Sequence, residues 1–292
     1  MKKIFYSSYT RLFIGFILVS VIVVSIQLSS VSILAKTQIN KDYKDVITSI
    51  AAAAAALISY ITLFHYYERR HVNEIGISSF GKNAGIGLMT GLILQSLVIL
   101  VIFSFGSYSV LKVNPISYVL PGFAIAFSSA IFEEILFRGI LFRLLEEKLG
   151  SIIALTISAS IFGLMHLANK NSNLYSALSV AVQAGVLLGA SFIYSKNLWL
   201  PIALHFGWNF AESGIYGAII SGAQISKSLF TAKFVGVTLV TGGAFGPENS
   251  LQATIFCLAA AIIFLSLSKK GNKFIRPSWK EKKEYTVVKE AQ

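Results

Sequence analysis

The chain has 292 residues, of which 55% are hydrophobic and only 13% are charged. Soluble domains carry about 25% charged residues, so this composition and a mean hydropathy of +0.70 exclude an ordinary soluble domain and indicate an integral membrane protein. The net charge of +12 would suit a nucleic-acid partner, but the basic residues lie between apolar runs and in the C-terminal tail. We therefore expect contact with lipid head groups and no nucleic acid. The single cysteine, Cys257, excludes an intramolecular disulfide and any cysteine-based metal site.

Eight apolar segments predict membrane helices, because a helix needs roughly 20 such residues to cross a bilayer. The first follows Lys2, Lys3 and Arg11 and is longer than a typical signal-peptide core, so we expect an uncleaved anchor. The sequence thus predicts an all-α, polytopic helix bundle that spans the cell membrane several times. The segments are 11–35, 46–67, 84–105, 117–145, 151–168, 175–195, 198–213 and 251–267.

The predicted organisation has three parts and no internal repeat or linker. Residues 1–116 form three N-terminal membrane helices, 117–267 the part that carries the polar motifs, and 268–292 a basic cytoplasmic tail. Loop 214–250 is the longest connection, and its Gly-rich stretch reads as a turn or re-entrant segment rather than a phosphate-binding loop.

The distribution of Lys and Arg predicts that both termini are cytoplasmic. In that orientation 17 basic residues lie inside, 7 lie outside, and Arg138 lies within a membrane segment. The tail contributes 8 of the 17, so the bias without it is 9 to 7.

Segment 117–145 contains three ionisable residues far from its ends, which marks it for function because buried charge is expensive in a bilayer. Glu134 and Arg138 are four residues apart and share a helix face, so they can form an ion pair. Glu133 is rotated by about 100° from Glu134, and an unpaired carboxyl in a low-dielectric site can exchange protons. The spacing predicts a structural brace and a separate working acid. The alternative is one interhelical polar network without chemistry.

Two further segments each place polar groups on one helix face. Phe162 and His166 are four residues apart in segment 151–168, and His205 and Asn209 are four apart in segment 198–213. An imidazole and a carboxamide that face one point can form an oxyanion hole. The alternative for each pair is interhelical hydrogen bonding. Gln183 and Gln95 are weaker candidates. The conjunction of one acid, two imidazoles and one amide on three helices favours a hydrolytic site.

These three motifs together resemble the CPBP (Abi) family of intramembrane proteases, which includes the type II CAAX prenyl endopeptidases and bacteriocin-immunity proteins. The motifs are Glu133-Glu134-Ile-Leu-Phe-Arg138, Phe162-Gly-Leu-Met-His166 and His205-Phe-Gly-Trp-Asn209. The resemblance implies that Glu133 and His166 activate the attacking water and that His205 and Asn209 stabilise the oxyanion. It also implies that Glu134 and Arg138 support the site. The expected substrate is a CAAX-type, leader or bacteriocin-related peptide.

The resemblance leaves the role of a metal open. A Zn²⁺ held by Glu133, His166 and His205 is chemically sensible, and a metal-free glutamate mechanism uses the same residues. The sequence lacks the His-Glu-x-x-His motif of the zincins, so we expect no tightly bound metal.

Two other functions also fit the sequence. Buried Glu, Arg and His can form the proton relay of a transporter, although no repeat halves are present. A non-enzymatic immunity or partner-binding protein would use the same polar groups only for helix packing. The topology poses a further question, because His166 is predicted near the outer end of its helix whereas Glu133 is predicted at mid-membrane. Either the helix ends differ from the prediction, the cavity is deep, or the orientation is reversed.

Overall fold

A computed structural model describes residues 7–279 of the protein as a bundle of helices with one small sheet. Within these residues six helical stretches are long and apolar enough to cross a membrane, which confirms an all-α, multi-pass membrane protein. The principal helices are α2 (Ser8–Ala35), α3 (Lys41–Glu68), α4 (Phe80–Ser104), α5 (Leu120–Glu134), α6 (Arg143–Met165), α7 (Leu174–Val180), α8 (Leu187–Ser195), α9 (Trp199–Asn209), α10 (Thr238–Thr241) and α11 (Leu251–Lys270).

All eight predicted segments are helical. Only six spans are counted because two of the segments join into one helical stretch and one is too short. Segments 117–145 and 151–168 belong to one helical stretch, Ile116–Ala168. The chain turns within this stretch at Gly150, whose φ of 75° and ψ of 166° are not helical. The predicted segment 198–213 corresponds to α9 and the π-helical residues Phe210–Ile215, and it is too short to be counted as a span on its own.

Glycine is required at position 150 because of this conformation and a close contact. A Cβ there would lie 2.8 Å from the carbonyl oxygen of Ile275. The Ile275 carbonyl accepts a hydrogen bond from the Ser151 backbone N–H at 3.0 Å. The first part of the predicted basic tail is therefore held against the start of the second half of α6, while residues 280–292 lie outside the described residues.

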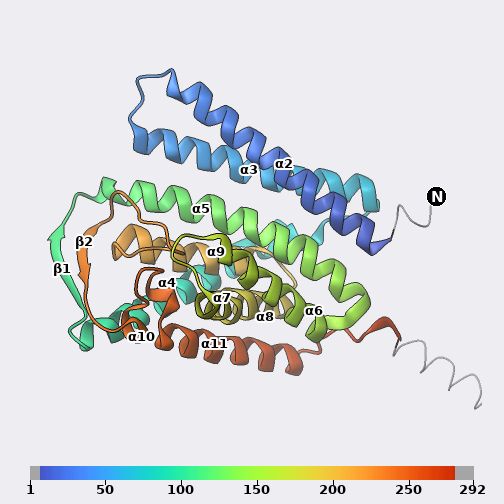
Figure 1. Ribbon diagram of the computed structural model, residues 1–292. Helices are drawn as coiled ribbons and strands as arrows, with labels where there is room; N and C mark the ends of the chain where they lie inside the picture. Colours follow the sequence, from blue (N-terminus) through green and yellow to red (C-terminus); the bar gives the residue numbers. More distant parts are fainter. Residues whose placement is uncertain (1–6, 280–292) are drawn as a thin grey trace, which may run out of the picture.

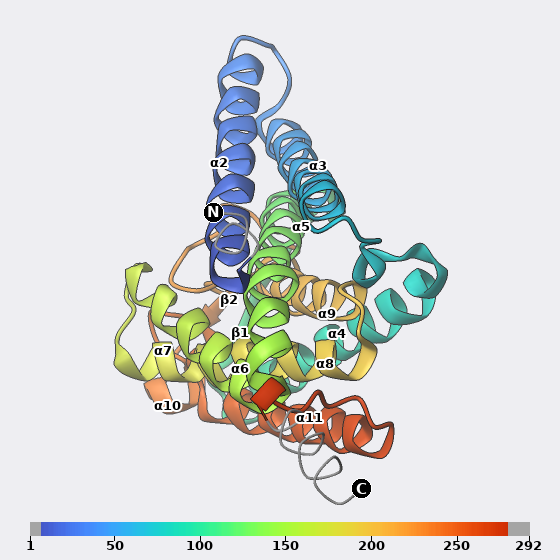
Figure 2. The same cartoon turned by 90° about the vertical axis from the view of Figure 1, so that its right-hand side faces the viewer.

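The helices form layers around α5, α6 and α9. Figure 1 and Figure 2 show α2 and α3 side by side on one face of α5 and α11 on the opposite face of the bundle. Helices α4 and α9 pack closely: a Cβ at Gly91 of α4 would lie 2.2 Å from the carbonyl oxygen of Leu204 on α9. Small residues allow membrane helices to approach in this way, and the contact fixes the helix that carries His205 and Asn209.

Two strands that the sequence analysis did not predict join distant parts of the chain. Strand β1 (Tyr108–Val113) pairs antiparallel with β2 (Phe230–Phe234), and Tyr108 lies opposite Phe234. The sheet lies at the left-hand end of the bundle in Figure 1, whereas α2 begins and α11 ends at the right-hand end. It anchors loop 214–250 to the connection between α4 and α5. The predicted division of the chain at residues 116 and 267 remains a prediction.

Candidate active site

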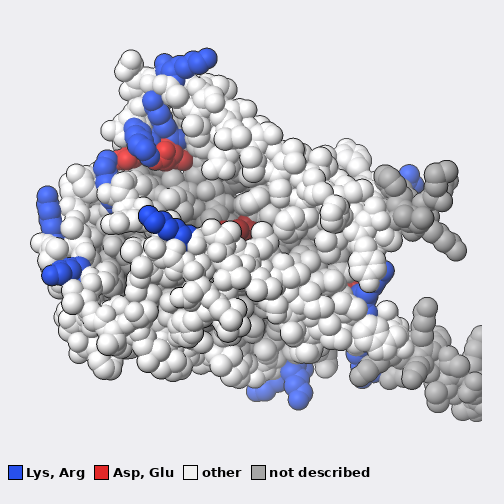
Figure 3. All heavy atoms as spheres, viewed as in Figure 1, with Lys and Arg blue, Asp and Glu red and all other residues white. Residues whose placement is uncertain are grey.

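The four residues predicted to carry the chemistry line one cavity. Glu133 comes from α5, His166 from the end of α6, and His205 and Asn209 from α9. The cavity, which we call the outer cavity, has a volume of about 640 Å³. Figure 3 shows that the surface is hollowed on the face of Figure 1, with acidic atoms inside the hollow. Three helices therefore bring the predicted acid, imidazoles and amide to one space.

The two adjacent glutamates have different surroundings, as the helix geometry predicts. Glu133 is half-buried and lines the outer cavity. Glu134 is fully buried, and its Oε1 accepts a hydrogen bond from Arg138 Nη1 at 2.7 Å. The predicted pairing of Glu134 with Arg138 is thus present. Glu133 remains the carboxylate that a molecule in the cavity can reach.

Arg138 connects three helical segments. Its Nη2 donates to the carbonyl oxygens of Ala184 and Gly185, at 3.2 Å to the latter. Its guanidinium also lies 4.8 Å from the ring centroid of Phe162 on α6. An arginine presents five donors in a rigid fork, which lets one buried side chain fix several neighbours at once. This arrangement agrees with a supporting role for Glu134 and Arg138.

The hydrogen bond of His205 determines what its second nitrogen can do. Its Nδ1 lies 3.1 Å from Glu134 Oε1. The same Glu134 oxygen accepts a hydrogen bond from Arg138 Nη1, so it also accepts from His205 and Nδ1 carries a hydrogen. In a neutral imidazole the other nitrogen, Nε2, is then only an acceptor. His205 can donate a hydrogen bond into the cavity once its ring is protonated, and the carboxylate of Glu134 at Nδ1 can stabilise that positive charge.

His166 has the same hydrogen-bond pattern, but its Nδ1 faces a neutral carbonyl group and not a carboxylate. Its Nδ1 lies 2.8 Å from the carbonyl oxygen of Phe162, and a carbonyl can only accept. The hydrogen is therefore on Nδ1, and Nε2 keeps a free lone pair that can take a proton. The ring also packs against Phe162 at a centroid distance of 4.7 Å. The hydrogen bond to the Phe162 carbonyl and the packing against the Phe162 ring together orient an imidazole that can act as a base.

Asn209 completes the cavity wall one helical turn after His205. Its Nδ2 lies 3.4 Å from Ser129 Oγ on α5, which ties α9 to the helix of Glu133. Asn209 is buried, with 8% of its surface exposed. A carboxamide held in this way presents an N–H donor beside His205, as an oxyanion hole requires.

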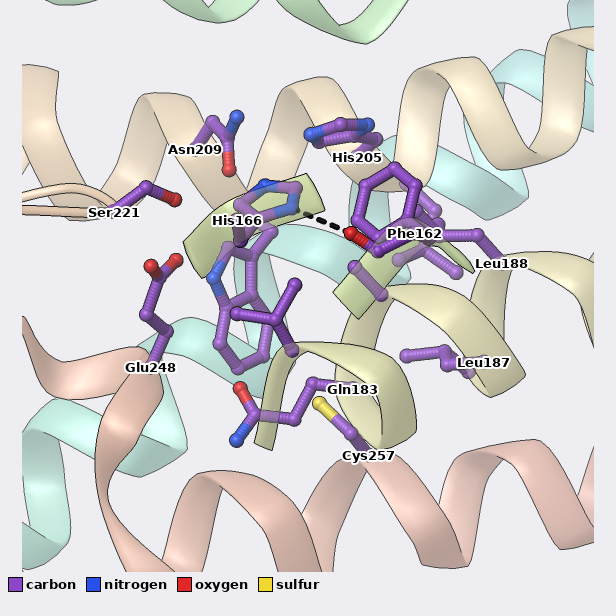
Figure 4. A pocket seen from close by; sticks show the side chains of 14 residues that line it. Phe162, His166, Gln183, Leu187, Leu188, His205, Asn209, Ser221, Glu248 and Cys257 are labelled. Carbon is purple, nitrogen blue, oxygen red and sulfur yellow. Dashed lines mark hydrogen bonds between the residues drawn. The ribbon is translucent and has the colours of Figure 1, made fainter. Parts of the chain in front are cut away.

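A second, smaller space adjoins this wall. We call it the inner chamber; its volume is about 40 Å³, and it shares His166, His205, Asn209 and Ser221 with the outer cavity. Figure 4 shows His166 between Asn209 and His205, with Glu248 on one side of the chamber and Gln183 and Cys257 farther along its wall. One water needs about 10–15 Å³ in this measure, so the chamber has room for about three waters.

Two buried carboxyl groups at this chamber were not identified from the sequence. Glu248 lines it, and Glu212 lies behind Glu248, accepting a hydrogen bond at Oε1 from the Glu248 backbone N–H at 3.3 Å. Glu212 was missed because it stands beside the predicted end of its segment. Glu248 was missed because it stands in the Gly-rich loop. A re-entrant loop returns into the bundle, so that interpretation could have marked its acidic residue as a candidate.

Three π-helical segments accompany the site residues. They are Ile135–Phe142, which contains Arg138, Ala181–Val186, which contains Gln183, and Phe210–Ile215, which contains Glu212. A π-helix widens the turn and is frequent at functional sites. Here the widened segment around Gln183 also contains the carbonyl oxygens that accept from Arg138.

The described residues do not fit the three-ligand zinc site that the sequence suggested as one alternative. No group of three His, Cys, Asp or Glu residues between 7 and 279 is arranged so that it could hold a metal ion. Glu133, His166 and His205 share a cavity wall, and the hydrogen bond of each histidine through Nδ1 leaves its Nε2 free, so it is the placement of the three groups that does not fit a common metal ion. We therefore derive no step through a metal.

The part of α6 after Gly150 is short enough for His166 to lie at the depth of Glu133 within the membrane. After Gly150 its helical residues 151–165 span roughly 22 Å at 1.5 Å per residue, less than the roughly 30 Å of a hydrocarbon core. His166 follows directly, so a helix end can still lie within the membrane and meet a residue from the middle of the Ile116–Ala168 stretch. The outer cavity is rimmed by residues 169–171 and 219–224, which belong to the connections at the end of the bundle that carries the sheet.

Comparison with known proteins agrees with the motifs. Residues 115–211 match the family model described as "Type II CAAX prenyl endopeptidase Rce1-like". A 79-residue stretch, 27% of this chain, is 37% identical to a Bacillus subtilis (strain 168) protein named "Putative membrane peptidase YdiL", of which it covers 30%. The chain thus aligns with less than a third of that relative. No solved structure matches. The resemblance to CPBP proteases is confirmed for this region.

Proposed function

From the premise that residues 115–211 belong to the Rce1-like family, we propose that this membrane protein is an endopeptidase that hydrolyses peptide bonds within the bilayer. The observation that carries the proposal is the shared cavity of Glu133, His166, His205 and Asn209. Neither the family pattern nor the cavity alone would suffice. Together they give a reaction class and the side chains to perform it.

The proposed reaction begins with a water in the outer cavity. Glu133 and the free Nε2 of His166 are the two proton acceptors that face it. As the water oxygen bonds to the carbonyl carbon of the peptide, one of its protons passes to this pair. The tetrahedral intermediate then collapses, the C–N bond breaks, and the held proton passes to the leaving nitrogen. Protons and charge balance without a metal.

His205 and Asn209 are proposed to stabilise the oxyanion of that intermediate. Asn209 offers an amide N–H, and His205 offers Nε2–H when its ring is protonated beside Glu134. Donors aimed at a developing charge in a water-poor site are among the largest contributions to catalysis, and one donor is worth about 10²–10³ in kcat.

The substrate is proposed to be a peptide that enters from the side opposite to the termini. The rim residues of the outer cavity lie at the end of the bundle away from the basic tail, and the 17 to 7 distribution of Lys and Arg puts that end outside the cytoplasm. Prenylated tails are cytosolic, so this orientation favours a leader or bacteriocin-related peptide over a CAAX-type substrate.

The test of activity uses the full chain in lipid nanodiscs with prenylated and unprenylated peptide libraries in H₂¹⁸O. We expect unprenylated peptides to be cut and to carry one ¹⁸O in each new carboxyl group, measured by mass spectrometry. Asn209→Ala should reduce the rate by about 10²-fold. Absence of products from both libraries, together with pH-driven solute flux in liposomes, would favour the transporter. Absence of both would favour the non-enzymatic immunity protein.

The orientation makes a separate prediction that does not depend on activity. The native Cys257 is buried, so new cysteines at the exposed Lys170 and Lys82, at opposite ends of the bundle, can report topology. We expect a membrane-impermeant maleimide to label Lys170→Cys on intact cells and Lys82→Cys only after permeabilisation. The opposite pattern would place the rim in the cytoplasm and restore prenylated tails as the favoured substrates.

A further inference from the structure

Glu248 differs from the other residues of the site because nothing in the sequence motifs involves it. It follows Pro247 in a short 3₁₀ turn of the loop that returns to the bundle before α11. Its side chain is 7% exposed, and its Oε1 has no hydrogen-bond partner in the described residues. A buried carboxylate oxygen without a partner is costly, so its retention at the inner chamber calls for an explanation.

The loop brings the carboxylate toward the imidazoles. Gly246 has a φ of 122° and packs against the backbone of Ile219, earlier in the same loop. A Cβ at Gly246 would lie 2.2 Å from the Ile219 carbonyl oxygen. This approach brings Glu248 to the same chamber wall as Ser221. Figure 4 shows the Glu248 carboxylate directed toward Ser221, with His166 on the neighbouring part of the chamber wall.

The charged and titratable groups around Glu248 set its role. His166, His205 and Cys257 line the same chamber as Glu248. The Glu248 backbone N–H donates to Glu212, and Glu133 lines only the outer cavity. Two neighbouring buried carboxyl groups do not both ionise readily. Glu212 is fully buried, whereas Glu248 faces the chamber and the rings, so of the two Glu248 is the carboxyl group that we take to carry a negative charge.

We infer that Glu248 is a positioning residue for hydrolysis, which acts from the inner chamber on the side of the histidines opposite to Glu133. The inference rests on the proposed function. When His166 takes the proton of the attacking water it becomes an imidazolium, and Glu248 stabilises that charge directly or through the roughly three waters that the chamber can hold. The proton stays on His166 until it passes to the leaving nitrogen, and Glu248 is not itself protonated.

The test compares Glu248→Gln, which removes the charge and keeps the shape, with Glu248→Asp, which keeps the charge on a shorter chain. The control is Glu147→Gln, the same change at a side chain that is 38% exposed and far from the chamber. We expect Glu248→Gln to lower kcat by about 10–10²-fold with KM unchanged, Glu248→Asp to lose several-fold less kcat than Glu248→Gln, and the control to match wild type.

A merely structural role would give a different result. Glu248→Gln that folds, as judged by thermal unfolding, and retains wild-type kcat would overturn the inference and leave the proposed function intact. Equal loss in the Gln and Asp variants would also overturn it. If Glu248→Gln does not fold, Ser221→Ala is the second variant, because it removes the neighbouring hydroxyl. It should lower kcat several-fold without changing KM. An unchanged kcat would count against the inference. Wild-type protein that cuts no peptide would remove both proposals.

Discussion

Replacing Glu133 with Gln is expected to reduce kcat for peptide hydrolysis by about 10²–10⁴-fold, with little change in KM. The amide has nearly the same shape as the carboxyl group but cannot act with His166 as the acceptor pair for the proton of the attacking water. Glu133 is half-buried at the outer cavity and shares its wall with His166, His205 and Asn209. The rate is measured with a peptide that the wild-type protein cuts, at several substrate concentrations.

The neighbouring position supplies a comparison that separates the two glutamates. Glu134→Gln should also lose activity, because His205 loses the carboxylate that orients it, but it should lower the thermal unfolding temperature as well. Glu133→Gln should unfold at the wild-type temperature, since Glu133 is not the partner of the buried Arg138. Turnover by Glu133→Gln at the wild-type rate would remove it from the mechanism.

Arg138→Met should produce the largest loss of stability among single changes near the site. The ion pair of Arg138 with Glu134 is buried, with side-chain exposures of 2% and 0%. Removing one partner of a buried pair leaves an uncompensated charge and typically costs about 3–5 kcal/mol of folding free energy. The variant also releases the carbonyl oxygens of Ala184 and Gly185. Thermal unfolding in detergent measures the effect.

A double variant tests the cause of that loss. Glu134→Gln combined with Arg138→Met removes both charges and should be more stable than Arg138→Met alone, although it should remain inactive. Lys227→Met is the control, since it breaks an ion pair with Asp42 in which the lysine is 36% exposed, and exposed pairs contribute little to stability. Equal unfolding temperatures for Arg138→Met and Lys227→Met would show that the buried pair is not a brace.

Regular helix geometry explains why much of the site could be predicted. The four-residue spacing of Glu134 and Arg138 on one face led directly to their ion pair. The rotation of about 100° between neighbours separated Glu133 from Glu134. The apolar run lengths gave the membrane helices, and Gly150 separates two predicted segments where the chain turns. These features depend on local periodicity, which a sequence displays.

Features that depend on long-range contacts were missed. The pairing of β1 with β2 joins residues more than one hundred positions apart. The sequence of loop 214–250 shows no alternating pattern that would predict a strand there. The position of Glu248 depends on the fold of that same loop against residues 219–222. The π-helical segments were also missed, because a widened turn follows from packing, such as the Arg138 contacts, rather than from helix propensity.

The most direct test of the shared site is an experimental structure of the protein with a peptide phosphinate bound, since this group mimics the tetrahedral intermediate. We predict one phosphinate oxygen within about 3 Å of Asn209 Nδ2 and His205 Nε2, and the other within about 3 Å of Glu133. Binding elsewhere, or Glu133, His166, His205 and Asn209 facing separate walls around the inhibitor, would contradict the account.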